Sequence, residues 1–347
     1  MTSTPQEPIR KSAIALVLGA TGGIGGAVAT RLHRDGYRVR ALHRNADVMQ
    51  RRLPIFEWVQ GDAMIANDVV TAAEGADVIV HAVNPPGYRN WGTLVLPMID
   101  NTITAAKKAG ATILMPGTVY NYGPDSFPDV REDSPQNPVS IKGRIRVELE
   151  RRLEIASTEG VRVLIVRAGD YFGPGAANNW FSQVVVKAGK PVTSITNPAS
   201  PQTGHQWAYL PDVAETMVRL LAASDRLPTF ARFHMDGFFD RDGIQLAAAI
   251  RRVVGKPDLP IKRFPWLLVR LSSPFVPMFR ELLEMRYLWK QIVRLDNRAL
   301  VDFLGEEPHT PIDHAVRATL EDLRCLPPAA GLVGPPERGR SVEGAMA

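Results

Sequence analysis

The chain has 347 residues, 45% hydrophobic and 22% charged, a composition typical of globular rather than disordered or membrane-spanning proteins. Its net charge of +5 comes from scattered Lys and Arg residues without interleaved aromatics, which argues against a nucleic-acid partner. The single cysteine, Cys325, excludes an intrachain disulfide framework and indicates a reducing compartment. Because the polar N-terminus lacks a signal-peptide core, we expect a cytoplasmic protein with no membrane partner.

A glycine-rich turn follows the first predicted strand. Apolar residues fill 13–18, glycines follow at three-residue spacing, and apolar residues then recur with helical periodicity. Glycine allows a ligand to approach closely, and a helix that begins there directs free N–H groups outward. The turn therefore predicts a pyrophosphate site formed by Gly19, Ala20, Thr21, Gly22, Gly23, Ile24 and Gly25.

Strands and helices alternate as far as residue 167. We expect strands at 37–42, 55–59, 76–83, 111–115 and 161–167, and helices at 25–35, 67–73, 94–109 and 140–157, the second of them capped by Asn67. Such alternation requires right-handed crossovers, so it predicts an α/β protein with a Rossmann-type doubly wound parallel sheet.

The alternation loosens beyond residue 170, which predicts a smaller and mostly C-terminal substrate-binding region. A strand at 206–210 and a helix from Pro211 are expected to return to the first domain. The segment 264–291 is rich in Trp, Phe and Leu but is broken by charges and prolines, which favours helices over a pocket rather than membrane association. The predicted organisation is a disordered segment 1–12, a dinucleotide-binding domain 13–170 with 205–235, a substrate region 171–204 with 236–325, and a disordered tail 326–347.

Several ordered motifs resemble those of the extended and atypical short-chain dehydrogenase/reductases, a group that contains nucleotide-sugar epimerases and dehydratases. GATGGIG at 19–25 resembles their glycine turn, 167–174 their R-x-x-N-x-Y-G-P segment, and 209–214 their V-x-D-V-A. The resemblance implies a nicotinamide cofactor and a small-molecule substrate. It also implies that Gly61, Asp62 and Ala63 lie on the adenine side of the cofactor, and that Ala82, Val83 and Asn84 lie beside the ribose and nicotinamide.

The end of the second strand indicates which dinucleotide is preferred. A carboxylate about twenty residues after the glycine turn would bind the ribose hydroxyls of NAD, whereas arginine there would bind the 2′-phosphate of NADP. The strand ends in His43 and Arg44, and no acidic residue precedes Asp47. NADP(H) is therefore favoured over NAD(H), although a solvated Arg44 would leave NAD(H) open.

The catalytic pattern of the resemblance is incomplete. It implies a tyrosine, a lysine four residues later and a serine or threonine on the preceding strand, and Thr118 stands at the last of these positions. Aligned through Glu148, the following helix has Ser140 in place of the tyrosine and Arg144 in place of the lysine. An alkyl hydroxyl is a weaker acid than a phenol, and arginine does not exchange its proton, so the usual acid/base pair is missing.

Three residues are candidate substitutes. Lys142 lies near the start of the same helix, where it would reach the site or remain solvated. Tyr120 and Tyr122 would share the side of Thr118 if the extended backbone continued, and each would supply a phenol or simply pack in the core. We expect Asp170, Asn179, His205 and Trp207 on the substrate side, and the histidines show no metal-ligand spacing.

Two hypotheses follow. The first is an NADP-dependent oxidoreductase or epimerase-like enzyme for a small hydroxyl or carbonyl substrate, with a non-standard acid/base site. The second is a catalytically inactive NADP(H)-binding sensor or interaction protein, motivated by Ser140 and Arg144. The resemblance also implies a homodimer formed through the helices at 94–109 and 140–157.

Overall fold

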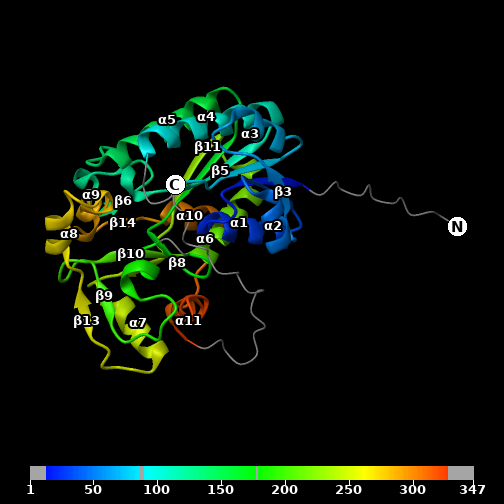
Figure 1. Cartoon of the computed structure of the whole chain (residues 1–347). Coiled ribbons are helices and arrows are strands. Elements are labelled where there is room, and N and C mark those ends of the chain that lie inside the picture. The colour runs from blue at the N-terminus through cyan, green and yellow to red at the C-terminus, as the bar shows by residue number, and fades with distance from the viewer. Residues whose placement is uncertain (1–12, 86–89, 177–178, 327–347) are drawn as a thin grey trace.

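A parallel sheet of seven strands organises the computed structural model, which describes residues 13–85, 90–176 and 179–326 (Figure 1). Its order is β11-β7-β5-β4-β1-β2-β3, and the order reverses between β1 and β4, where sheets of this type bind ligands. The predicted doubly wound sheet is confirmed. The strands are β1 (Ile14–Leu18), β2 (Arg38–His43), β3 (Glu57–Gln60), β4 (Val78–His81), β5 (Thr112–Gly117), β7 (Val163–Arg167) and β11 (Phe230–His234).

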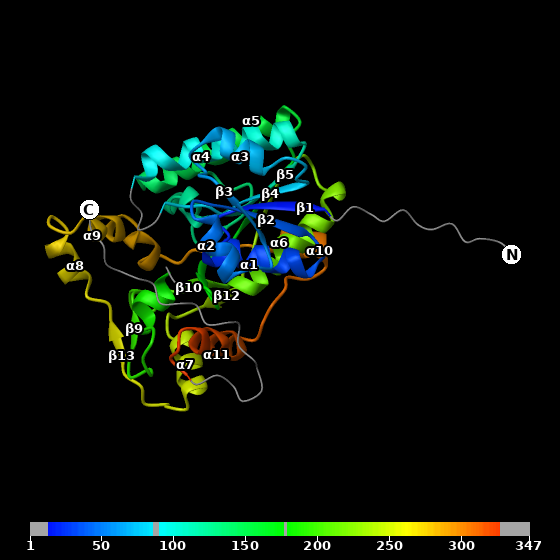
Figure 2. The same ribbon diagram turned by 45° about the vertical axis from the view of Figure 1, so that its right-hand side comes forward.

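Helices cover both faces of this sheet, as Figure 2 shows. One face carries α1 (Gly23–Arg34), α2 (Ala46–Arg52), α6 (Leu210–Ala222) and α10 (Arg298–Leu304). The other face carries α3 (Ala66–Ala72), α4 (Trp91–Ala109) and α5 (Ile141–Thr158). Because both faces are covered, β1 is buried at all five positions.

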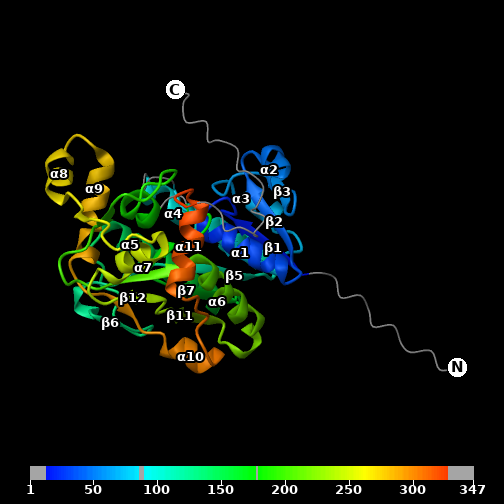
Figure 3. The same ribbon diagram turned by 90° about the horizontal axis from the view of Figure 1, so that it is seen from below.

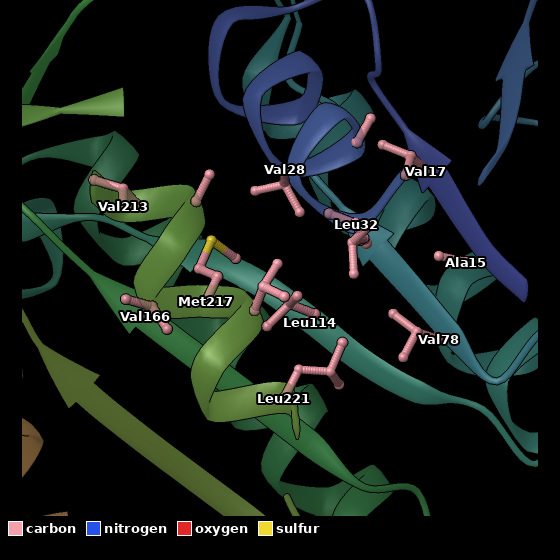
Figure 4. Close-up of a cluster of buried hydrophobic side chains, with 14 of the residues drawn as sticks. Ala15, Val17, Val28, Leu32, Val78, Leu114, Val166, Val213, Met217 and Leu221 are labelled. Atoms are coloured by element: carbon pink, nitrogen blue, oxygen red, sulfur yellow. The ribbon is translucent and has the colours of Figure 1, made fainter. Parts of the chain in front are cut away.

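The core on the α1 side explains why α6 belongs to the dinucleotide-binding fold. Val213, Met217 and Leu221 recur at four-residue spacing on one face of α6, and that face packs toward Val28 and Leu32 of α1 (Figure 4). Both helices lie over β-strand residues, and all five of these side chains are at most 5% exposed. Residues 210–234, which form α6 and β11, therefore belong to the main sheet and its helices although they follow part of the second lobe in the sequence.

The remaining residues form a second lobe, of which β9, β13, α7 and α11 lie below the main sheet in Figures 1 and 2 and α8 and α9 lie to its left. Of its three small sheets, the first has the order β12-β10-β8, the second pairs β9 with β13, and the third pairs β6 with β14. The strands are β6 (Asp129–Val130), β8 (Asp170–Phe172), β9 (Ile195–Asn197), β10 (His205–Tyr209), β12 (Phe238–Asp240), β13 (Ile261–Arg263) and β14 (Arg294–Leu295). The helices are α7 (Gln245–Val254), α8 (Trp266–Ser272), α9 (Pro277–Glu284) and α11 (Ile312–Asp322).

Some local expectations were wrong. The sequence pattern missed α2, because a seven-residue helix that exposes Arg51 and Arg52 has little apolar periodicity. Ile65, and not Asn67, is the N-cap of α3, and Phe181–Val185 forms a single π-helical turn. Apart from Leu326, the segments 1–12 and 326–347, for which we expected disorder, lie outside the described residues.

Candidate functional site

The glycine turn joins β1 to α1 at the carboxyl edge of the sheet. Gly19 has φ +93°, and a Cβ there would lie 2.6 Å from the carbonyl oxygen of Ala82. A Cβ on Gly25 would lie 2.2 Å from the oxygen of Gly19, so the turn packs backbone against backbone. At the N-cap, Gly22 provides no side-chain hydrogen bond to the first turn of α1. The turn therefore has the conformation and the N–H donors that a pyrophosphate requires.

The other predicted cofactor residues follow the adjacent strands. Arg44 is exposed after β2, and Gly61 after β3 donates its N–H to His43 O at 3.2 Å. The turn at Asp62 is held by its N–H bond to Asp68 Oδ2 at 2.9 Å. Ala63 accepts a bond from Asn101 in α4. Since β4, β1, β2 and β3 are neighbours, the structure brings the predicted segments, 19–25, 44, 61–63 and 82–84, to one edge.

Helix α5 corrects the expected alignment of the catalytic helix. Ser140 is its N-cap, and the Ser140 hydroxyl accepts the Gly143 N–H at 3.0 Å. Arg144 is exposed. The buried cations on this helix are instead Lys142 and Arg146, two residues later in the sequence and with the same spacing of four. The inward pair of α5 is therefore Lys142 and Arg146, in place of Ser140 and Arg144.

Lys142 is neither solvated nor free to move. It is 2% exposed, and its Nζ contacts Glu281 and lies 2.7 Å from Glu284 Oε2, both on α9. Glu284 also accepts the N–H groups of Ile141 and Lys142. These bonds fasten α9 to the N-terminus of α5.

Arg146 connects α5 to the segment after β4. Its Nη2 donates to Asn84 Oδ1 at 3.3 Å, and its guanidinium lies 5.1 Å from the centre of the Trp91 ring. Burial, helped by the positive charge of Arg146, lowers the pKa of His81 to about 3. The Nδ1 of His81 is 2.8 Å from the Thr102 hydroxyl, which itself donates to Met98 O. A neutral His81 that donates from Nδ1 satisfies both contacts.

The two candidate tyrosines have different environments. Beyond Thr118 the chain turns into a short 3₁₀ helix at Val119–Asn121, so the expected continuation of the extended backbone was wrong. Tyr122 is fully buried, with its hydroxyl 3.1 Å from His234 Nε2, and burial raises its pKa. Tyr120 instead lines a pocket. Only one of the two phenols is thus placed to meet a ligand.

A buried ion pair that the sequence analysis missed lies beneath these residues. Arg167, at the end of β7, pairs with Glu150 of α5 and donates to Thr118 O at 2.6 Å and to the Tyr122 hydroxyl at 3.2 Å. Both Arg167 and Glu150 are at most 3% exposed. The spacing of four that relates Lys142, Arg146 and Glu150 was the available signal.

A small pocket, partly open to solvent, lies where Tyr120 faces residues of the second lobe. Its walls include Asp170 at the start of β8, and the Asp170 carboxylate is 2.8 Å from His205 Nε2. The His205 ring in turn stacks on Trp289 at 3.7 Å. The lining residues are Tyr120, Asp170, Trp180, Glu281, Leu282, Met285, Leu288 and Trp289.

Two of the predicted substrate residues contribute from outside this pocket. Trp207 is 3% exposed and packs in the core of the second lobe, 5.1 Å from the His205 ring centre. The Asn179 carboxamide accepts the Ser182 N–H and donates to Ala176 O, so it orders the π-helical turn. Their side chains therefore support the pocket rather than line it.

A comparison with known protein families shows which family the chain belongs to. Residues 15–234 match the NAD dependent epimerase/dehydratase family. The chain belongs to this family. It is therefore assigned to the NAD(P)-dependent oxidoreductases and epimerases, with a nicotinamide dinucleotide as cofactor. A comparison with curated proteins found no match.

Solved structures share the fold at low sequence identity. MoeE5 in complex with UDP-glucose and NAD is 19% identical, has a TM-score of 0.69, and is matched over 90% of this chain and 99% of its own. UDP-N-acetylglucosamine 4-epimerase from Bacillus cereus is 17% identical, with a TM-score of 0.67 and coverage of 93% and 99%. The Bordetella bronchiseptica enzyme WbmH in complex with NAD+ is 19% identical, with a TM-score of 0.67 and coverage of 90% and 99%.

None of the helices in 13–85, 90–176 and 179–326 combines the length and apolarity needed to cross a membrane. Over the same ranges, no three His, Cys, Asp or Glu side chains gather as metal ligands would.

Proposed function

We propose that the chain is an NADP(H)-dependent oxidoreductase or epimerase-like enzyme that acts on a small substrate bearing a hydroxyl or carbonyl group. The main support is that the segment after β5, which carries Thr118 and Tyr120, packs on the first turn of α5. Gly143 packs so closely that a Cβ there would lie 2.2 Å from Tyr120 O. Tyr120 also shares the pocket wall with Glu281, the partner of Lys142.

The cofactor part of the proposal depends on the glycine turn and Arg44. The turn offers N–H donors to a pyrophosphate, and the exposed guanidinium of Arg44 would favour a 2′-phosphate. Ala82, Val83 and Asn84 would pass beside the nicotinamide ribose, with Asn84 positioned by Arg146. When bound, the nicotinamide would donate or accept the hydride at a substrate carbon.

Residues of the chain would transfer the proton to or from the substrate oxygen and stabilise the negative charge that develops on it. We assign the proton transfer to the Tyr120 phenol, and the holding of the substrate oxygen to the Thr118 hydroxyl. Positive charge at Arg146 would stabilise negative charge that develops on that oxygen, while Lys142, already paired with Glu281 and Glu284, would hold α9 beside the site. Asp170, oriented by His205, would accept a hydrogen bond from a substrate hydroxyl.

A panel of aldehydes, ketones and sugar nucleotides, tested with NADPH and NADH, examines this proposal directly. We expect oxidation of NADPH with at least one class. Tyr120→Phe should then lower turnover by about a hundredfold or more without weakening NADPH binding. Tyr37→Phe, on a phenol far from the pocket, is the control. The proposed enzyme would be rejected if no member of the panel oxidised NADPH or NADH and no sugar nucleotide was converted to its epimer.

A second candidate is a cofactor-binding sensor without turnover. Its specific support is that Glu281 and Glu284 of α9 both pair with the Lys142 ammonium. The positive charge of Lys142 on α5 is therefore already neutralised within the protein. This candidate predicts that NADPH changes hydrogen exchange in α9 while every substrate of the panel remains unconverted. We also propose a homodimer through α4 and α5, which light scattering can test.

A further inference from the structure

The helices α8 and α9 carry an unusual outer surface. Figures 1 and 3 show both helices at the edge of the molecule, away from α2 and β3. Large apolar side chains there are exposed: Phe275 by 85%, Leu267 by 70% and Leu271 by 65%. We call this outer surface the α8–α9 face, and it comprises Leu267, Leu268, Leu271, Phe275 and Met278. Five exposed apolar side chains within twelve residues exceed the scattered ones of an ordinary surface.

The charged side chains of the segment that carries this face, residues 259–280, are all positive. From residue 259 to residue 280 the sequence contains no acidic residue. Its four cations, Lys262, Arg263, Arg270 and Arg280, are all exposed. The first acidic residues beyond, Glu281 and Glu284, both bind the buried Lys142. The outer side of the segment is therefore apolar and basic, while its acidic side is used within the fold.

We infer that the α8–α9 face binds the surface of an anionic lipid bilayer. An interfacial segment places its apolar side chains among the acyl chains near the headgroups, while cations beside them meet anionic headgroups. Pro274 and Phe275 lie in the turn between the helices, which is the part that would enter most deeply. Neither helix spans the bilayer, so the contact is peripheral.

The absence of acidic residues distinguishes a bilayer from a second copy of this chain. A self-complementary interface would bring the same four cations of each protomer together, which is unfavourable. An anionic bilayer compensates them. The expectation from the sequence that 264–291 only packs over a pocket thus describes the inner side, where Leu282 and Met285 line the pocket.

Vesicle flotation of the full chain tests the inference. Wild-type protein should float with vesicles of phosphatidylcholine and phosphatidylglycerol at low ionic strength, and less with phosphatidylcholine alone. The double variant Leu268→Ser/Phe275→Ser should lower the partition coefficient at least tenfold. Arg263→Gln and Arg270→Gln should each lower it about fivefold.

Matched controls lie on the other lobe. Ile55, which is 52% exposed, and Arg34 are replaced as Ile55→Ser and Arg34→Gln, and both variants should float like the wild type. Thermal unfolding and NADPH binding verify that all variants are folded. No flotation of the wild type, or flotation that the α8–α9 variants leave unchanged, would overturn the inference. A dimer that Leu268→Ser/Phe275→Ser dissociates, without lipid binding by the wild type, would assign the face to self-association and also overturn it.

Discussion

The sheet edge formed by β1 to β4 and the region where α5 meets α9 differ in what defines the site, the backbone at the first and the side chains at the second. At the first, backbone geometry defines the site: Gly19 and Gly25 admit no side chain because carbonyl oxygens stand where a Cβ would be. At the second, side chains define the site, and Lys142 and Arg146 occupy the inward positions of α5. Backbone requirements tolerate little change, whereas side-chain positions allow a new chemistry on the same framework.

The largest expected effect is a loss of stability on breaking the buried ion pair between Glu150 of α5 and Arg167. Glu150→Gln should lower the free energy of unfolding by about 3–5 kcal/mol, because Arg167 would remain buried without its counter-charge. Urea denaturation measures this loss. Glu148→Gln is the matched control, since Glu148 meets Arg151 and Arg152 near the surface and should cost less than about 1 kcal/mol. Equal losses in the two variants would contradict the assignment of Glu150 as the buried partner.

The second prediction concerns the backbone-defined edge. Gly25→Ala should weaken NADPH binding at least a hundredfold, or about 2.7 kcal/mol, because its Cβ would displace Gly19 O. Isothermal titration calorimetry gives the affinity. Gly92→Ala adds the same methyl group at a position with nothing within 4 Å and should leave binding unchanged. Unaltered affinity in Gly25→Ala would show that the turn does not hold the dinucleotide.

These two regions also differ in how well the sequence predicted them. The glycine turn and the strands around it were predictable because their signals are local. The catalytic helix was misaligned because Glu148 and Glu150 both fit the pattern, and only the burial of Glu150 distinguishes them. The partner of Lys142 was not predictable, since Glu281 is 139 residues away.

The environments of Tyr120 and Tyr122 also depend on contacts that local sequence patterns do not predict. Even spacing placed Tyr122 beside Thr118 only while the strand continued, and the 3₁₀ turn at Val119–Asn121 ended that relation. Tyr122 instead reaches His234, a contact across 112 residues. Local periodicity therefore predicted the elements, and long-range packing determined which side chains meet.

A pH titration tests the burial of His81, which lies at the end of β4 near Arg146. The pKa of His81 lies at about 3 in the folded state and near 6.5 in the unfolded chain, so the unfolded state binds more protons in acid. The stabilisation is complete above pH 6.5 and is lost progressively as the pH falls from 6.5 toward 3. We expect a loss of about 2 kcal/mol between pH 7 and pH 5, measured by urea denaturation.

His81→Asn should flatten this pH dependence, although it lowers stability overall by disturbing the bond to Thr102. His314→Asn, on an exposed histidine of α11, should leave the profile as in the wild type. A profile that stays equally steep without His81 would show that other groups cause the acid sensitivity.

A smaller effect is expected where α9 is fastened to α5. Lys142→Met should raise hydrogen exchange of the α9 amides about tenfold, because Glu281 and Glu284 lose their common partner. Arg144→Met, on the exposed side of the same helix, should leave exchange unchanged. If Arg144→Met loosened α9 and Lys142→Met did not, the corrected alignment of α5 would be wrong.

The smallest expected effect concerns the preference of the cofactor edge for NADPH over NADH. Arg44→Gln should weaken NADPH binding about tenfold, because one charge-assisted bond at an exposed site would be lost. NADH, which has no 2′-phosphate, should bind Arg44→Gln and the wild type equally well. The ratio of the two affinities, measured by fluorescence titration, isolates the contribution of this guanidinium from changes in the glycine turn.

Arg52→Gln provides the control, since Arg52 is also exposed but lies at the far end of α2 from the strand terminus. It should leave both affinities within about twofold of the wild type. If Arg44→Gln instead weakened NADH and NADPH equally, Arg44 would act on a part common to both cofactors. The preference for NADP(H) would then lack its physical basis, while the glycine turn would keep its role.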